Sequence, residues 1–180
     1  MPRPAWIAAV ALTLALLAGC GGSGNKTVAT VGGDPLTQKQ LDAVVAHFRT
    51  EAQREGKDFP AEASAGFKPL RNRLLGLLVY RAELRQAADR LGVKVSENEI
   101  SKRLVTPSGG EQEGGGDTFP RDSVVAQLLT ERIFDKVTRD VKAPTQAELS
   151  ARRNQAMAAF LARLQRETKV RYEPGYAPSP

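Results

Sequence analysis

The chain has 180 residues, 41% of them hydrophobic, and a formal net charge of +6. This length suits one domain with its own hydrophobic core, and a single cysteine excludes an internal disulfide. The basic side chains are scattered, without a dense patch or interleaved aromatic residues, so we expect no nucleic-acid partner.

The first twenty residues have the pattern of an export signal. Arg3 and the amino terminus precede an apolar run over residues 5–17, and small residues follow. The run is shorter than the roughly 20 apolar residues that a bilayer-spanning helix needs. The sequence LAGC at residues 17–20 resembles the lipobox of bacterial lipoproteins. This resemblance implies cleavage before Cys20 and a thioether-linked diacylglycerol on its sulfur.

We interpret residues 1–19 as a signal peptide and residues 20–26 as a lipidated, flexible tether. The Gly-Gly-Ser-Gly-Asn stretch after Cys20 has no apolar side chain against which a buried cysteine could pack. Two acyl chains give stable anchoring. The mature chain of 161 residues keeps an excess of five basic side chains, which suits an anionic membrane surface. We therefore expect a protein anchored on the extracytoplasmic side of a membrane, the plasma membrane being favoured over an outer membrane.

The first predicted element is a β-strand at residues 28–31, before the turn residues Gly32-Gly33-Asp34-Pro35. Thr37 and Gln40 then have the spacing of a capping box, which predicts the start of a helix. The helix carries apolar residues at helical spacing until it ends near Gly56, namely Leu41, Val44, Val45, Phe48 and Ala52.

The longest predicted helix runs from about Pro69 to Leu91. Gly92 follows where a left-handed C-terminal cap belongs. The inner stripe of this helix is apolar at every position but one: Leu70, Leu74, Leu77, Leu78, Arg81, Leu84, Ala88 and Leu91. An extended segment, Val93-Lys94-Val95, leads to a second capping box at Ser96 and Glu99. It opens a short helix over residues 97–104 that should bury Ile100 and Leu104.

Residues 107–117, PSGGEQEGGGD, contain five glycines and no apolar side chain, which predicts a mobile loop. The ligand spacing of an EF-hand calcium site is absent from it. We expect the next helix to begin with Asp122 as its N-cap and to end by Pro144. Its expected inner residues are Val125, Leu128, Leu129, Ile133 and Val137, with Phe134 at the edge.

A third capping box, Thr145 and Glu148, predicts a last helix through about Glu167. Its expected stripe is Leu149, Ala156, Phe160, Leu161 and Leu164. Residues 169–172 read as a second strand. The elements together predict a mainly α domain over residues 27–173, with a Pro-rich tail at 174–180. Pairing of residues 28–31 with 170–172 would bring the two ends of the domain together.

Four segments resemble, in order, the chaperone domain of SurA and PrsA-type foldases. VATVGGDPLTQKQLDAVV at residues 28–45 is similar to its opening, V-A-x-V-N-G-x-x-I-T, with Gly32 where asparagine is common. RNRLLGLLVYRAELRQAADRLGVKVSENEI, LLTERIFDKVTRDVKAPTQAEL and AFLARLQRETKVRYEPGYAP are similar to later segments. The resemblance implies a SurA N-terminal-like helical domain with paired terminal strands, and unfolded or partly folded exported proteins as partners.

In that family, a parvulin-type prolyl isomerase domain commonly separates the two halves of the chaperone domain. Here Glu148 leads almost directly into the closing helix, and no stretch is long enough for such an insert. His47 is the only histidine, and we interpret it as a partly exposed surface residue. We therefore expect no catalytic residue, no cofactor and no metal. Cys20 is the one expected site, for lipidation.

The leading hypothesis is a membrane-tethered holdase that shields apolar segments of exported chains. The first alternative is a lipoprotein scaffold that recruits one specific partner, because a fold alone does not fix function. The second, less favoured, is a peptidyl-prolyl isomerase.

Overall fold

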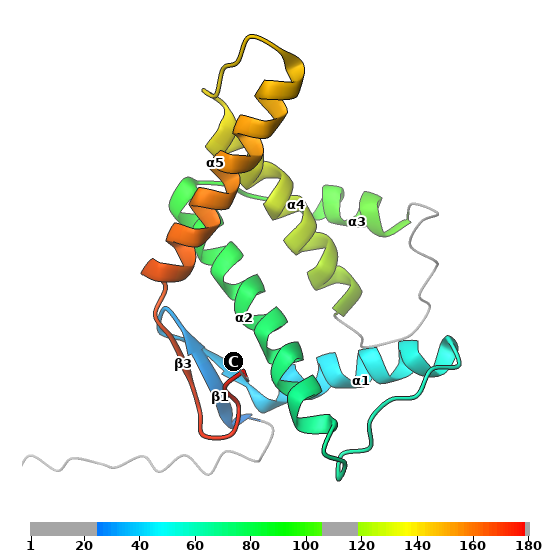
Figure 1. Cartoon of the computed structure of the whole chain (residues 1–180). Coiled ribbons are helices and arrows are strands. Elements are labelled where there is room, and N and C mark those ends of the chain that lie inside the picture. The colour runs from blue at the N-terminus through cyan, green and yellow to red at the C-terminus, as the bar shows by residue number, and fades with distance from the viewer. Residues whose placement is uncertain (1–24, 106–118, 179–180) are drawn as a thin grey trace, which may run out of the picture.

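The computed structural model describes residues 25–105 and 119–178. Cys20, the expected signal peptide and the expected loop at 107–117 lie outside these ranges. The described chain forms β1 (Thr27–Val31), β2 (Asp34–Thr37), α1 (Gln38–Arg54), α2 (Phe67–Leu91), α3 (Glu97–Val105), α4 (Phe119–Thr138), α5 (Gln146–Glu167) and β3 (Val170–Tyr172). The predicted mainly α class with a small terminal sheet is confirmed (Figure 1). None of the described helices is long and apolar enough to cross a membrane.

The strands form one antiparallel sheet in the order β2-β1-β3. Val31 lies opposite Val170, and Ala29 opposite Tyr172, which confirms the predicted pairing of residues 28–31 with 170–172. The strand β2 was not predicted. Asp34 and Pro35, expected in a turn, belong to it. Because β2 is an edge strand, the sheet tolerates its proline.

The turn between β1 and β2 is built around Gly32, which has a φ of +58°. The amide nitrogen of Gln86 on α2 donates hydrogen bonds of 2.8 Å to the carbonyl oxygen of Val31 and to a carboxylate oxygen of Asp34. A Cβ atom on Gly32 would lie 2.4 Å from the Gln86 side-chain oxygen. An asparagine at position 32 would therefore displace the glutamine that fastens this turn to α2.

The predicted helix starts at residues 37, 96 and 145 are confirmed. Gln40 N donates to Thr37 Oγ1 at 3.3 Å while Thr37 N donates to Gln40 Oε1 at 2.7 Å, and Ser96 and Glu99 form the same reciprocal pair. Glu148 N donates to the hydroxyl oxygen of Thr145 at 3.2 Å. Gly92 has a left-handed φ of 65° at the end of α2, as predicted.

The start of α4 was predicted wrongly. The helix begins at Phe119, so Asp122 lies inside its first turn and is not its N-cap. The carboxylate of Asp122 pairs instead with Arg85 on α2, at 2.8 Å. The start of α2 also differs from expectation, since the helix begins at Phe67 and Pro69 lies within its first turn. Proline is tolerated there because the first-turn N–H groups have no partner within the helix.

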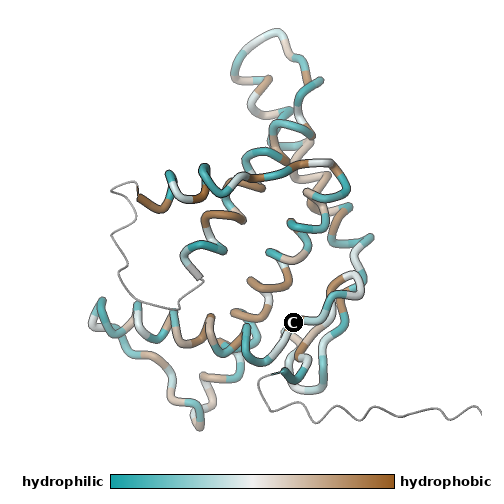
Figure 2. The backbone as a smooth tube through the Cα atoms, turned by 180° about the vertical axis from the view of Figure 1, so that it is seen from behind, coloured by the Kyte–Doolittle hydropathy of each residue, from teal (hydrophilic) through white to brown (hydrophobic). Residues whose placement is uncertain are grey.

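Two hydrophobic cores share α2 as their common wall. The lower core joins the sheet, α1 and the first half of α2 around Leu41 and Leu75, which are fully buried. The upper core joins the second half of α2 to α4 and α5 around Leu84 and Ile133. Hydrophobic residues recur at intervals along these helices (Figure 2), as expected for helices with a buried face.

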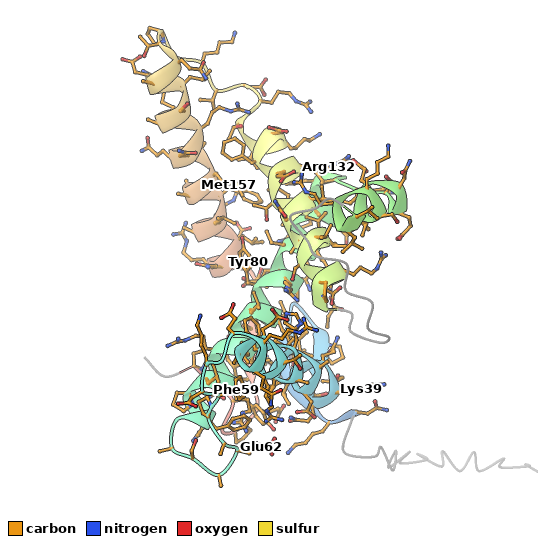
Figure 3. All side chains as sticks on the ribbon, turned by 90° about the vertical axis from the view of Figure 1, so that its right-hand side faces the viewer. Lys39, Phe59, Glu62, Tyr80, Arg132 and Met157 are labelled. Atoms are coloured by element: carbon orange, nitrogen blue, oxygen red, sulfur yellow. The ribbon has the colours of Figure 1, made fainter. Side chains whose placement is uncertain are left out.

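The upper core contains one residue that the predicted stripe of α5 omitted. Met157 is 7% exposed and lies between α5 and α4 (Figure 3). The short helix α3 buries Ile100, as predicted, and leaves Leu104 half-buried. Ion pairs also join α3 to α4, including Arg132 with Glu99 and Arg103 with Glu131.

Candidate functional site

The middle of α2 carries two buried charged residues where the two cores meet. Arg81 and Glu83 are each 5% exposed. Because they are two positions apart on a helix, their side chains point to different sides of α2. The structure thus places a polar layer between two apolar clusters, and only Arg81 stood out in the sequence as a charge within the stripe.

Arg81 connects α2 to the first turn of α4. One of its terminal nitrogens donates a hydrogen bond of 2.7 Å to the hydroxyl of Ser123. Burial lowers the pKa of Arg81 from its ordinary value, and the negative charge of Asp122 partly opposes this effect. Since Asp122 also pairs with Arg85, the first turn of α4 is held to α2 by two neighbouring polar contacts.

A small pocket lies beside this junction, where β2, α1, α2 and α4 meet. Its volume is about 60 Å³, and both apolar and charged side chains line it. The lining residues are Leu36, Gln40, Ala43, Val44, Leu78, Arg81, Arg85 and Asp122. Small-molecule and cofactor sites usually measure about 300–1,000 Å³. This pocket has room for one small apolar side chain, not for a metabolite.

The surface around the cores offers partly covered apolar side chains and few fully exposed ones. Val105, at the end of α3, is the exposed large hydrophobic residue of the described ranges, at 81%. Half-buried residues at the edge of the lower core include Phe59, Phe67 and Leu70, and at the upper core Tyr80 and Phe160. Apolar contact with another chain would therefore use core edges and the pocket.

Glu83 faces the sheet on the other side of α2. Burial raises the pKa of its carboxyl group. The pKa of the Tyr172 hydroxyl on β3 is also raised, first by burial and then by the negative charge of Glu83. Glu83 is buried and Tyr172 half-buried, and neither lines the pocket.

His47, the one histidine of the chain, lies against an aromatic side chain. His47 is half-buried on α1, and its ring lies edge-on to that of Phe48, with 5.6 Å between ring centroids. Within residues 25–105 and 119–178, no three histidine, cysteine or acidic residues are grouped in a way that could hold a metal ion. Cys20, the expected lipidation site, lies outside the described residues.

Comparison of the sequence with known proteins identifies a SurA-like N-terminal domain. The family model described as the SurA-like N-terminal domain matches residues 4–115, which include β1 through α3. The chain is also similar to the foldase protein PrsA from two strains of Clostridium perfringens. Each is 27% identical over 133 residues, in an alignment that covers 64% of this chain and 39% of the relative. The chain thus spans about two fifths of the length of the curated relatives it matches.

Proposed function

Because the matched segment covers more than half of its length, the chain belongs to the family of SurA-like N-terminal domains, and we propose that it is a membrane-tethered extracytoplasmic chaperone that binds unfolded exported proteins. The similarity to the foldase protein PrsA supports a role in protein folding. The lipid tether, the extracytoplasmic location and the binding of unfolded exported proteins are part of the proposal and do not follow from these comparisons.

The pocket beside Arg81 is the observation that best supports binding of unfolded chains. Its buried apolar residues Leu36, Val44 and Leu78 can contact one aliphatic side chain, and its exposed Arg85 can contact the neighbouring peptide groups. Full burial of such a side chain stabilises a complex by about 1.5–3 kcal/mol. One contact of this size gives weak, reversible binding, which suits a holdase that must release its clients.

The test is suppression of aggregation, with two matched variants of α1. Ala43 is exposed at the pocket, so Ala43→Glu would put a carboxylate at its mouth without disturbing the core. Ala46 is exposed on the same helix but does not line the pocket, so Ala46→Glu is the control. We expect Ala43→Glu to weaken suppression of several unrelated unfolded clients about threefold or more, and Ala46→Glu to leave it unchanged.

The result also separates this proposal from the alternatives. Equal effects of the two variants would contradict the pocket as the binding site. Saturable binding of one partner, with no effect on unrelated clients, would favour a recruiting scaffold. Acceleration of proline-limited refolding at catalytic amounts would favour an isomerase.

The tether has its own test, which concerns Cys20. Cys20→Ser removes the thiol that would carry the diacylglycerol. We expect the unsubstituted chain to fractionate with membranes and to carry the mass of a diacylglycerol group, and the variant to leave the membrane fraction. A mature protein with an unmodified thiol at residue 20 would contradict the tether and leave the chaperone proposal to be judged by its own assay.

A further inference from the structure

A second and larger depression lies where the turn after β1 meets α2 and the end of α5. Its volume is about 540 Å³. It is lined by Thr30, Gly32, Gly33, Gln86, Arg90, Glu167, Thr168, Lys169 and Arg171, and we call it the basic groove. Three of these residues are cationic and one is acidic, so the groove carries an excess of positive charge.

The positive charge of the basic groove is not neutralised within the described chain. Arg90, Lys169 and Arg171 are exposed, and none of them forms an ion pair with a described residue. Glu167, the acidic member, is directed to Arg163, with 3.8 Å between the charged atoms. Many other arginines of the described surface pair with a carboxylate, so these three cations are available to an external anionic group.

The strand β3, which borders this groove, is an end strand of the sheet (Figure 1). Backbone hydrogen bonds flank the β1–β3 pair: Gly32 N donates to the carbonyl oxygen of Lys169 at 2.9 Å, and Glu173 N donates to the carbonyl oxygen of Val28 at 3.0 Å. Hydrogen-bonded positions alternate along an antiparallel pair. The N–H and C=O groups of Val170 and Tyr172 therefore point away from β1. They form no backbone hydrogen bond with the rest of the described chain.

We propose that the outer edge of β3 and the basic groove together bind an extended, acidic polypeptide segment. The segment would add as a strand, pairing its backbone with Val170 and Tyr172, while its carboxylates reach Arg90, Lys169 and Arg171. The inference rests on the proposed function, because it names a class of client and the way in which that client is held.

The backbone pattern selects a polypeptide over an anionic lipid headgroup. A strand edge presents donors and acceptors in alternation, and another backbone matches both. A phosphate group offers acceptors only, so it would leave the carbonyl oxygens of Val170 and Tyr172 unmatched. The short length of β3 limits the pairing to a few bonds, and the three cations supply the remaining affinity and the choice of acidic sequences.

The test measures binding of labelled peptides to the full chain in a mild non-ionic detergent by fluorescence anisotropy. One peptide of about ten residues alternates glutamate with valine or threonine, and a second has lysine in place of glutamate. A third keeps the glutamates but carries N-methyl groups on the amides of one strand edge. We expect the acidic peptide to bind about tenfold more tightly than either of the others. Equal binding of the N-methylated peptide would contradict strand addition.

Two triple variants with the same change in charge test the groove. Arg90→Gln/Lys169→Gln/Arg171→Gln should weaken the acidic peptide about tenfold. The control, Lys94→Gln/Lys136→Gln/Arg139→Gln, removes three exposed cations from a separate depression and should change binding less than about twofold. Equal losses would show non-specific attraction and contradict the proposal.

A backbone variant tests the strand edge itself. Val170→Pro removes an outward N–H group and none of the hydrogen bonds to β1. It should weaken the acidic peptide about fivefold. If this variant fails to fold, the N-methylated peptide decides the same point.

The remaining controls separate the two proposals. Displacement of the peptide by phosphatidylglycerol vesicles, together with undiminished binding of the N-methylated peptide, would assign the groove to lipid and overturn the inference. A groove variant that keeps its affinity for the acidic peptide and still suppresses aggregation fully would contradict the inference but not the proposed function. Peptide binding by an unsubstituted chain that suppresses no aggregation would contradict the proposed function alone.

Discussion

The hydroxyl group of Tyr176 donates a hydrogen bond of 2.6 Å to Oε1 of Gln38, the first residue of α1. The guanidinium of Arg71 on α2 lies 4.4 Å from the centre of the Tyr176 ring. The amide of Asn72 donates to the backbone oxygen of Ala177 at 2.7 Å. The segment that follows β3 is therefore packed against both helices of the lower core and contributes to its stability.

Substitution of Tyr176 should separate the hydrogen bond from the packing of the ring. Tyr176→Phe removes only the hydrogen bond, so the free energy of unfolding should fall by about 0.5–1.5 kcal/mol. Tyr176→Ala also removes the ring beneath Arg71 and should lower it by about 2–3 kcal/mol. Urea denaturation measures both effects. Tyr80→Phe is the control: it removes a hydroxyl with no hydrogen-bond partner in the described chain, and it should change the free energy of unfolding by less than about 0.5 kcal/mol. Equal effects of Tyr176→Phe and Tyr80→Phe would show that the tail hydrogen bond contributes nothing.

The turn between β1 and β2 predicts a larger cost at Gly32 than at another left-handed glycine. Gly56 has a φ of +65° and open space around it, so Gly56→Ala should lower stability by about 1 kcal/mol through backbone strain alone. Gly32→Ala adds a collision with Gln86 and should lower it by about 2–3 kcal/mol. In a Gln86→Ala background the extra cost should largely disappear. A cost at Gly32 that does not depend on residue 86 would refute this account of the turn.

Features of the fold that depend on neighbouring residues could be predicted from the sequence. Thr37 and Ser96 cap helices because their partners stand three residues away, and Gly92 ends α2 through its own backbone freedom. The terminal strands could be paired because each is too short to be stable alone.

Features that depend on distant partners could not be predicted. Asp122 is a good N-cap residue by type, but its carboxylate pairs with Arg85, 37 positions earlier, from a place inside the first turn of α4. Pro35 favoured a turn, and only the position of β2 at the sheet edge allows it in a strand. The pocket and the basic groove each combine residues from several elements, so no local sequence pattern could predict either of them.

The junction between α2 and α4 should depend on Ser123 more than on Asp122. Ser123→Ala removes the acceptor for a nitrogen of the buried Arg81 and should lower the free energy of unfolding by about 1–3 kcal/mol. Asp122→Asn weakens an ion pair whose two side chains are 35% and 48% exposed, and should lower it by less than about 1 kcal/mol. Chemical denaturation at neutral pH compares the two. A larger effect at Asp122 would mean that the exposed pair, not the buried arginine, holds α4 in place.

Glu83 makes stability depend on pH. Its pKa is raised by burial above the ordinary value of 4.5, so the folded chain holds this proton more firmly than the unfolded chain. Between pH 4.5 and the raised pKa, the folded state therefore binds more protons, and the free energy of unfolding falls as pH rises. Above that window the full cost of an ionised, buried carboxylate is present.

Glu83→Gln keeps the shape of the side chain and removes the ionisation. The variant should be more stable than the unsubstituted chain at pH 7, and this gain should shrink as pH falls and vanish below about pH 4.5, where both chains carry a neutral group. Urea denaturation across this pH range measures the difference in the free energy of unfolding. Glu148→Gln, at an exposed position in the first turn of α5, is the control and should not stabilise the chain at any pH. A gain that is the same at every pH would mean that the amide acts through packing or hydrogen bonding, and that the charge of Glu83 does not destabilise the fold.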